Sequence, residues 1–440
     1  MTAAPARRWA YEALYKSETM GQDPRIFLEE LWEEGEAQAS DRALASALVQ
    51  GVWREKKVLD ARLSPFLRGP LDLPVRIILR MALYQLLYLS RIPPRAAVHE
   101  AVELAKAYAP RAQGLVNGVL RSFLRRHPSP RLNLPVEEAF PQWLVAKWHE
   151  ELGEGETRAL LEALRRLPET VVRVNRRKAT LEEVRASLLA QGVEVKEGKL
   201  FPKEALRLQR TRGLRRLEAF QKGWIAVQEE SSMAAVAALD PQPGERVLDV
   251  AAAPGGKATS MAEKMGDSGE VVANDSDRER LRLVEENAER LGLKNLTYTS
   301  YDGRHLPTEW AASFDRVLAD LPCSGLGILH RRGDLRWRKT RDQIPHLQRL
   351  QKEILQGVLP VLRPGGVLVY STCTVSRPEN QKVVEFLTEE MDLQLEDLRP
   401  YLPPALREEP SAPYGWVQLL PHRHGTDGFF IARLRKGDLP

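Results

Sequence analysis

The sequence of 440 residues contains few of the residues that build covalent cross-links and metal sites. It has only two cysteines and eight histidines. Two cysteines make no disulfide framework, as expected for a reducing cytoplasm. Neither they nor the scattered histidines show the spacing of a metal site. We therefore predict a cytoplasmic protein that uses no metal.

Long apolar runs are also missing. No segment approaches the roughly 20 apolar residues that cross a bilayer, and residues 1–11 carry arginines without the apolar core of a secretory signal. This excludes a membrane protein and predicts no membrane partner. The net charge of +5 is compatible with a polyanionic partner. The sequence has no obvious oligomerisation stripe, so we expect a monomer.

The two cysteines lie in short motifs that follow predicted strands. Cys323 belongs to Asp-Leu-Pro-Cys-Ser-Gly at 320–325, and Cys373 to Ser-Thr-Cys-Thr at 371–374. A free cysteine is usually a small buried apolar residue. Two cysteines in such settings instead favour thiol chemistry. Either could be a nucleophile, and a second thiol beside it would suggest a covalent intermediate that must be made and broken.

Hydrophobic periodicity divides the chain into three predicted domains, at 1–126, 127–220 and 221–440. The first is helical, with helices expected at 3–16, 41–63, 75–89, 98–108 and 114–126. The second has linker helices within 141–166 and a small α+β module, with strands at 171–175, 193–196 and 206–209 and a helix at 181–191. In the third, strands alternate with helices, which predicts a parallel, doubly wound sheet. Its strands are expected at 246–250, 270–274, 296–299, 314–319, 367–371 and 429–434.

The third domain lacks both the Gly-x-Gly-x-x-Gly fingerprint and the P-loop, which disfavours NAD and ATP. Its first strand instead leads into a loop of small residues that lets a ligand approach the backbone closely and ends at a helix N-terminus. Asp275, after the second strand, suits the ribose hydroxyls, and Asp302, after the third, can reach an adenine amino group. Any one of these acids could instead be a helix cap. Together with the loop they predict S-adenosylmethionine (SAM) binding, by Ala251, Ala252, Ala253, Pro254, Gly255, Gly256, Lys257, Asp275, Asp302 and Asp320.

The expected strand order brings both cysteines to this cofactor. In the common doubly wound order the fourth and fifth strands lie next to the first, and ligands bind beyond their carboxyl ends. A thiolate that adds to C6 of cytosine makes C5 able to attack a methylsulfonium. A carboxylate such as Asp320 can hold N3 during the addition, and Lys257 can stabilise the activated ring. A second thiol can assist the final elimination.

Basic residues beside the predicted crevice could bind RNA. Cations neutralise phosphates and an indole can stack on a base, although a solvated charged loop is the simpler interpretation. The candidates are Arg331, Arg332, Arg336, Trp337, Arg338 and Lys339 after the first cysteine, and Arg176 and Arg177 in the α+β module.

These motifs, together with Gly-Thr-Asp-Gly-Phe-Phe at 425–430 and the segment 223–232, resemble the RNA cytosine-C5 methyltransferases of the NOL1/NOP2/Sun family. The resemblance covers the C-terminal half of the chain and implies a Rossmann-like class I methyltransferase domain. It implies that Cys373 is the nucleophile and that Cys323 helps release the product. Ala251 departs from the family, in which many members have cysteine at this position.

The N-terminal domain resembles the RNA-binding NusB-like domain, through residues 91–94, 97–106 and 116–121. The middle module is similar to the family's RRM-like subdomain. A NusB-like domain fused to this methyltransferase resembles the RsmB (Sun) type, which implies 16S rRNA, naked or in a partly assembled small subunit, as substrate and partner. Two alternatives stay open: a tRNA cytosine-C5 methyltransferase, and a non-catalytic RNA-binding assembly or antitermination factor. The intact cysteines and acids argue against the second alternative.

Overall fold

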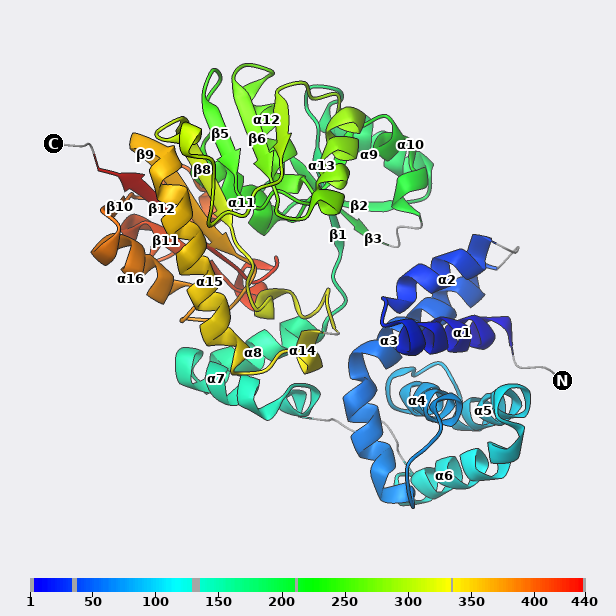
Figure 1. The fold of residues 1–440 in the computed structure, drawn as a ribbon. Coiled ribbons are helices and arrows are strands. Elements are labelled where there is room, and N and C mark those ends of the chain that lie inside the picture. The colour runs from blue at the N-terminus through cyan, green and yellow to red at the C-terminus, as the bar shows by residue number, and fades with distance from the viewer. Residues whose placement is uncertain (1–3, 34–37, 129–134, 210–212, 334, 438–440) are drawn as a thin grey trace. The chain divides into compact units, whose positions relative to one another are not determined.

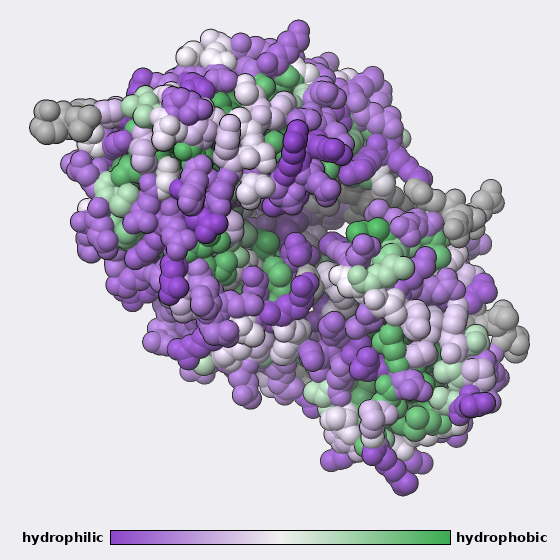
Figure 2. All heavy atoms as spheres, viewed as in Figure 1, coloured by the Kyte–Doolittle hydropathy of each residue, from purple (hydrophilic) through white to green (hydrophobic). Residues whose placement is uncertain are grey.

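The computed structural model describes residues 4–33, 38–128, 135–209, 213–333 and 335–437 (Figure 1). The chain divides into two compact units, Met1–Val145 and Ala146–Pro440. Hydrophilic side chains cover most of the visible surface of each unit (Figure 2). Among the described residues, no helix is both long enough and apolar enough to cross a membrane. The predicted limits of three domains stay a prediction.

The first unit is helical, as predicted. Its helices are α1 (Pro5–Met20), α2 (Pro24–Glu33), α3 (Ala39–Leu63), α4 (Leu73–Tyr88), α5 (Pro94–Tyr108) and α6 (Gln113–Arg126). Several begin with proline in the first turn, where its fixed φ suits a helix and its missing N–H is not needed. The apolar residues of α4 leave no polar face, so this helix lies in the core, in contact with α1, α3, α5 and α6. The sequence did not predict α2.

The division between the units falls within α7 (Gln142–Leu152). Gly153, at φ 85°, separates α7 from α8 (Glu154–Arg165). A small antiparallel sheet follows, in the order β2-β3-β1-β4. Its elements are β1 (Thr170–Val174), α9 (Leu181–Ala190), β2 (Glu194–Glu197), β3 (Ala205–Gln209), α10 (Glu218–Gln221) and β4 (Ile225–Val227). Strand β4 was not predicted, and it extends this sheet beyond residue 220.

A large mixed sheet forms the rest of the second unit. Its order is β10-β12-β9-β8-β5-β6-β7, and β11 also pairs with β12. The strands are β5 (Arg246–Asp249), β6 (Glu270–Asn274), β7 (Leu296–Thr299), β8 (Phe314–Asp320), β9 (Leu362–Thr372), β10 (Leu393–Leu395), β11 (Trp416–Leu419) and β12 (Phe429–Lys436). Strands β5 to β9 are parallel, as predicted, and β12 is antiparallel to its neighbours. The predicted Rossmann-like architecture is confirmed.

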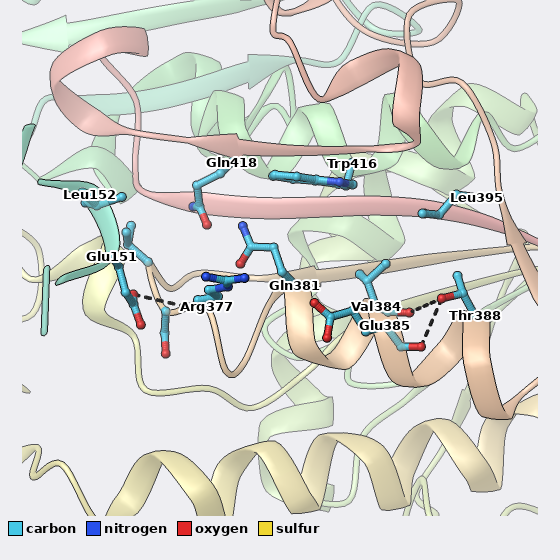
Figure 3. Close-up of a pocket in the computed structure, with 12 residues that line it drawn as sticks. Glu151, Leu152, Arg377, Gln381, Val384, Glu385, Thr388, Leu395, Trp416 and Gln418 are labelled. Atoms are coloured by element: carbon cyan, nitrogen blue, oxygen red, sulfur yellow. Dashed lines mark hydrogen bonds between the residues drawn. The ribbon is translucent and has the colours of Figure 1, made fainter.

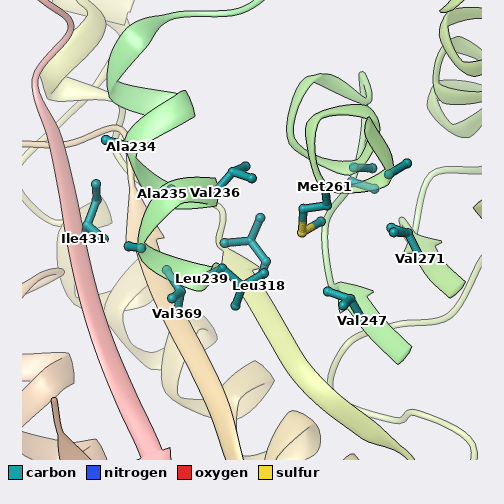
Figure 4. Packing of buried hydrophobic residues seen from close by; sticks show 14 of the residues in the cluster. Ala234, Ala235, Val236, Leu239, Val247, Met261, Val271, Leu318, Val369 and Ile431 are labelled. Carbon is teal, nitrogen blue, oxygen red and sulfur yellow. The ribbon is translucent and has the colours of Figure 1, made fainter. Parts of the chain in front are cut away.

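Helices cover both faces of this sheet. The helices are α11 (Glu230–Leu239), α12 (Gly256–Met265), α13 (Arg278–Leu291), α15 (Gln343–Val358) and α16 (Gln381–Glu390), with short helices α14 (Leu335–Arg338), α17 (Pro404–Arg407) and α18 (Pro421–His424). Val247, Val271 and Val369 pack against α11 and α12 on one face (Figure 4). Their chain neighbours Leu248 and Val272 face α15 and α16 on the other. Burial on both faces explains why these strands are nearly continuous apolar runs.

Candidate active site

The two cysteines meet at the carboxyl ends of neighbouring strands. Cys323 follows the end of β8 by three residues, and Cys373 follows β9 directly. Their Sγ atoms are 3.3 Å apart, and both side chains are partly buried free thiols. The pairing of β8 with β9 thus joins two motifs that are 50 residues apart in the chain.

Hydrogen bonds tie the two cysteine loops together. The hydroxyls of Ser324 and Thr374, the residues that follow the two cysteines, are 2.7 Å apart. The backbone N–H of Gly327 donates to the carbonyl of Cys373 at 3.1 Å. Direct bonds between the two loops therefore fix the separation of the thiols.

A cation and a carboxylate lie beside the thiols. Lys257, in the first turn of α12, forms an ion pair with Asp320, the last residue of β8. The other oxygen of Asp320 accepts a hydrogen bond from the hydroxyl of Ser371 at 3.0 Å. Burial opposes the charge of Lys257, but the carboxylates of Asp320 and Asp249 outweigh it and raise the Lys257 pKa. Lys257 is therefore positively charged.

The thiols and this cation affect each other. The hydrogen bond with Cys373, followed by burial, raises the pKa of Cys323 well above its usual range. Cys323 therefore holds a proton at neutral pH that it can share with its neighbour. The Cys373 thiol in turn contributes to raising the pKa of Lys257, so the two groups are close enough to interact.

The small-residue loop between β5 and α12 is held by Asp275. One oxygen of Asp275 accepts from the N–H of Ala253 at 3.0 Å, and the other from the N–H of Asp277 at 3.0 Å. Gly255 has φ 102°, and a Cβ here would lie 3.0 Å from backbone and side-chain atoms of Val284. The loop thus requires glycine at this point, where the chain turns into the helix.

Asp249 is a candidate site residue that the sequence analysis did not single out. It ends β5 and is 1% exposed, and neither carboxylate oxygen has a hydrogen-bond partner in the described structure. Burial raises its pKa to about 7, although Lys257 and the backbone of Ala251 act in the opposite direction. Such an orphaned group beside a glycine loop fits a bound ligand that donates to it. The sequence could have indicated Asp249 by its place at the end of a predicted strand, which it shares with Asp275.

Asp302 follows β7 but is paired within its own loop. It accepts hydrogen bonds from Arg304, whose closest nitrogen lies 2.6 Å away, and these lower the pKa of Asp302 to about 2. The carboxylate is thus ionised. An adenine amino group that binds Asp302 would donate to the same carboxylate as Arg304. Its predicted contact with adenine stays a prediction.

Two of the predicted RNA-binding arginines are occupied within the fold. Arg331 binds Asp427 at 2.7 Å and Glu229 at 2.6 Å and also contacts the carbonyl of Glu169. It thereby connects the segment before β12 to residues that flank β1 and β4 of the small sheet. Arg336 is completely buried. Its predicted contact with RNA stays a prediction.

The other predicted RNA contacts stay predictions. Arg332, Arg338 and Arg176 are exposed, and Trp337 and Lys339 are half-buried. Arg177 is exposed and pairs with Asp267. The described residues contain no cluster of acids, histidines and cysteines that could hold a metal ion.

A pocket of about 490 Å³ lies beside the Cys373 loop (Figure 3). Its walls come from α7, α16, β11 and residues 375–377, which follow Cys373. Gln418 in this wall donates to the carbonyl of Thr374 at 3.3 Å and accepts from Asn380 at 2.8 Å. The pocket wall therefore helps to hold the chain that carries Cys373.

The fold and this site together define a class of protein. The sheet is mostly parallel, acids follow its successive strands beside a loop of small residues, and two thiols are adjacent. Together these features describe a Rossmann-like methyltransferase. The family of 16S rRNA methyltransferases RsmB/F matches residues 236–435. The NusB family matches residues 4–125, and the ferredoxin-like domain of RsmF/B-like methyltransferases matches residues 140–215.

Curated relatives extend over the whole chain. A probable ribosomal RNA small subunit methyltransferase B of Bacillus subtilis is 37% identical, over 99% of this chain and all of the relative. A ribosomal RNA small subunit methyltransferase B of Escherichia fergusonii is 36% identical over 90% of this chain and 91% of the relative. The chain belongs to the RsmB/F family of methyltransferases, and the predicted NusB-like domain is confirmed.

Solved structures agree with this assignment. The crystal structure of PH0851 covers 99% of both chains with a TM-score of 0.82 and 28% identity. NSun6 from Pyrococcus horikoshii with SFG, an analogue of SAM, covers 68% of this chain and 99% of its own, with a TM-score of 0.60 and 26% identity.

Proposed function

We propose that this protein methylates C5 of a cytosine in 16S rRNA, using SAM and a covalent bond between Cys373 and C6. The observation that carries the proposal is the 3.3 Å separation of two thiols at the ends of β8 and β9, beside the Lys257–Asp320 ion pair. Amino-group methylation would need polar clamps on the amine and no thiol pair.

The names of the relatives support small-subunit rRNA as the substrate class. The NusB match supports an RNA-binding role for the first unit. We propose naked or partly assembled 16S rRNA as the partner. A tRNA substrate stays the alternative for the same chemistry.

The site residues fit SAM. Asp249 offers an orphaned buried carboxylate, the loop between β5 and α12 offers close backbone approach, and Asp275 lies at the end of β6, where ribose hydroxyls are bound in such sheets. When bound, the cofactor supplies a methyl group on an electrophilic sulfonium. The residues that hold it would be Asp249, Ala251–Lys257, Asp275 and Asp302.

Cys373 begins the reaction. Its thiolate adds to C6 of the cytosine, and the electron pair of the C5–C6 double bond moves toward N3 and makes C5 nucleophilic. Asp320 and Lys257 lie beside the thiols as one ion pair. Asp320 holds N3 through a shared proton, while the charge of Lys257 stabilises the activated ring.

Cys323 acts at the end of the reaction. After methylation, the C5 proton passes to a base, which can be a water molecule, and its electron pair re-forms the C5–C6 double bond. The electron pair of the C6–S bond then returns to the Cys373 sulfur. The Cys323 sulfur is in hydrogen-bond distance of that sulfur in the free protein, so it is placed to assist this release. The two roles follow the family resemblance, and the geometry is compatible with them.

A pair of variants tests the proposal. Cys373→Ala should abolish methyl transfer, whereas Cys323→Ala should accumulate a covalent adduct with 16S rRNA that survives on a denaturing gel. The double variant is the control and should form no adduct. An adduct in Cys373→Ala alone would reverse the roles, and full activity of both variants would refute the covalent mechanism.

Bisulfite sequencing of 16S rRNA and tRNA from a strain without this gene tests the substrate. One 16S cytosine should lose its protection, and restoring the wild-type gene should return it. An unchanged 16S pattern with a lost tRNA methylcytosine would favour the alternative.

A further inference from the structure

A buried carboxylate, that of Glu379, accepts hydrogen bonds from the loop that carries Cys323. Glu379 lies in the turn between β9 and α16 and is completely buried. Its oxygens accept from the backbone N–H of Ser324 at 2.7 Å and from the hydroxyl of Ser324 at 2.6 Å. The residue after Cys323 is thus held by two charge-assisted hydrogen bonds, which are among the stronger kinds in proteins.

The hydrogen-bond chain continues to the second cysteine. Because the Ser324 hydroxyl donates to Glu379, it accepts from the hydroxyl of Thr374, which lies 2.7 Å away. Asn380 holds the other flank, since its amide donates to the carbonyl of Thr374 at 3.1 Å and accepts from the hydroxyl of Thr372 at 2.6 Å. Two consecutive residues therefore fix the chain around both thiols.

The carboxylate has no ion pair among those of the described residues. Burying a carboxylate is unfavourable unless hydrogen bonds compensate it. Besides the two bonds from Ser324, the described residues offer it only a long contact of 3.5 Å from the amide of Gln351. A carboxylate so placed also contributes to raising the pKa of Cys323. Its compensation thus depends mainly on the Cys323 loop having the observed conformation.

We propose that Glu379 is a positioning residue that acts through Ser324 and sets Cys323 for the release of the methylated product. This inference rests on the covalent mechanism proposed above. The Cys373 loop is also held by Asn380, through Thr372 and Thr374, whereas Ser324 in the Cys323 loop depends on Glu379. Loss of Glu379 should therefore slow the breaking of the C6–S bond, in which Cys323 takes part, more than its formation.

The test compares Glu379→Gln in the full-length protein with wild type, using 16S rRNA and SAM. Glutamine keeps the shape but removes the negative charge, and its N–H₂ group can only donate, so the Ser324 hydroxyl and N–H can no longer both donate to a carboxylate. Loss of one hydrogen bond to a charged group corresponds to about 10- to 100-fold slower release. We expect a covalent adduct to accumulate on a denaturing gel while the single-turnover rate of adduct formation stays within about threefold of wild type.

Controls separate positioning from general destabilisation. Glu389→Gln makes the same change on the exposed end of α16 and should behave as wild type. Ser324→Ala leaves Glu379 in place but removes the hydroxyl link, and should also accumulate adduct. If Glu379→Gln fails to fold, the adduct level of Ser324→Ala tests the positioning role instead. Combining Glu379→Gln with Cys323→Ala should retain no more adduct than Cys323→Ala alone.

The outcomes distinguish the inference from the proposed function. If Cys323→Ala traps an adduct but neither Glu379→Gln nor Ser324→Ala does, the positioning role is wrong and the mechanism stands. The positioning role is also wrong if the variants form no adduct and lose activity only in proportion to a fall in their melting temperature. If no variant traps an adduct, the covalent mechanism itself fails.

Discussion

Replacing Asp249 by asparagine should stabilise the free protein and weaken its cofactor site. The carboxylate is 1% exposed and lacks hydrogen-bond partners in the described structure, and burial raises its pKa to about 7. Asparagine has nearly the same shape and no charge to bury. The free protein thus carries an unfavourable group that a ligand with suitable donors would satisfy.

The magnitude follows from linkage. The pKa of Asp249 is about 7 in the fold and 3.8 in an exposed chain, and one pKa unit corresponds to about 1.4 kcal/mol. Between these two values the unfolded chain has lost the proton that the fold retains, so stability falls as the pH rises through this window. Above pH 7, burial of the charged Asp249 lowers the free energy of unfolding by at most about 4 kcal/mol. The Asp249→Asn substitution would remove this cost, so the gain in stability should be about 2 kcal/mol larger at about pH 8 than at about pH 5.5.

Denaturant unfolding at both pH values measures this gain, and calorimetry measures binding of SAM. Glu286→Gln, on the exposed face of α13, is the matched control and should change neither. We expect Asp249→Asn to bind SAM at least about 10-fold more weakly, as for the loss of a charged hydrogen bond. A gain in stability that does not depend on pH, or unchanged affinity for SAM, would refute the reasoning.

Two further predictions test the geometry of the site. Diamide, a two-electron thiol oxidant, should link Cys323 to Cys373 within one chain, because their Sγ atoms are 3.3 Å apart; activity should vanish and return with dithiothreitol, and disulfide-linked dimers would contradict this arrangement. Gly255→Ala should lower stability by about 1–3 kcal/mol and abolish SAM binding, since its φ is 102° and a Cβ would meet Val284 at 3.0 Å. Gly69→Ala, where a Cβ meets open space, is the control in the same denaturant assay.

Patterns within a few residues predicted the elements that bear the site. The two-sided burial of β5, β6 and β8 leaves apolar runs that are short and bounded by turns. The predicted limits of β6 and β7 agree with the structure at both ends. Strand order then placed Cys323 and Cys373 together, because parallel strands share their carboxyl edge. Shorter elements such as β4 and β10 have too few residues for a period to show.

The roles of charged residues depended on partners far away in the chain. Arg331 stands in a basic run that looks solvated, but it pairs with Asp427, a buried acid 96 residues later in the chain. Glu379 stands in a polar turn, and its partner Ser324 is 55 residues earlier. A local pattern gives charge and spacing but not burial, and burial decides whether a charge meets solvent, RNA or another side chain. The same argument separates Asp249 from Asp302: both end or follow a strand, yet only Asp249 is buried without a partner, so the test of the cofactor site belongs at Asp249 first.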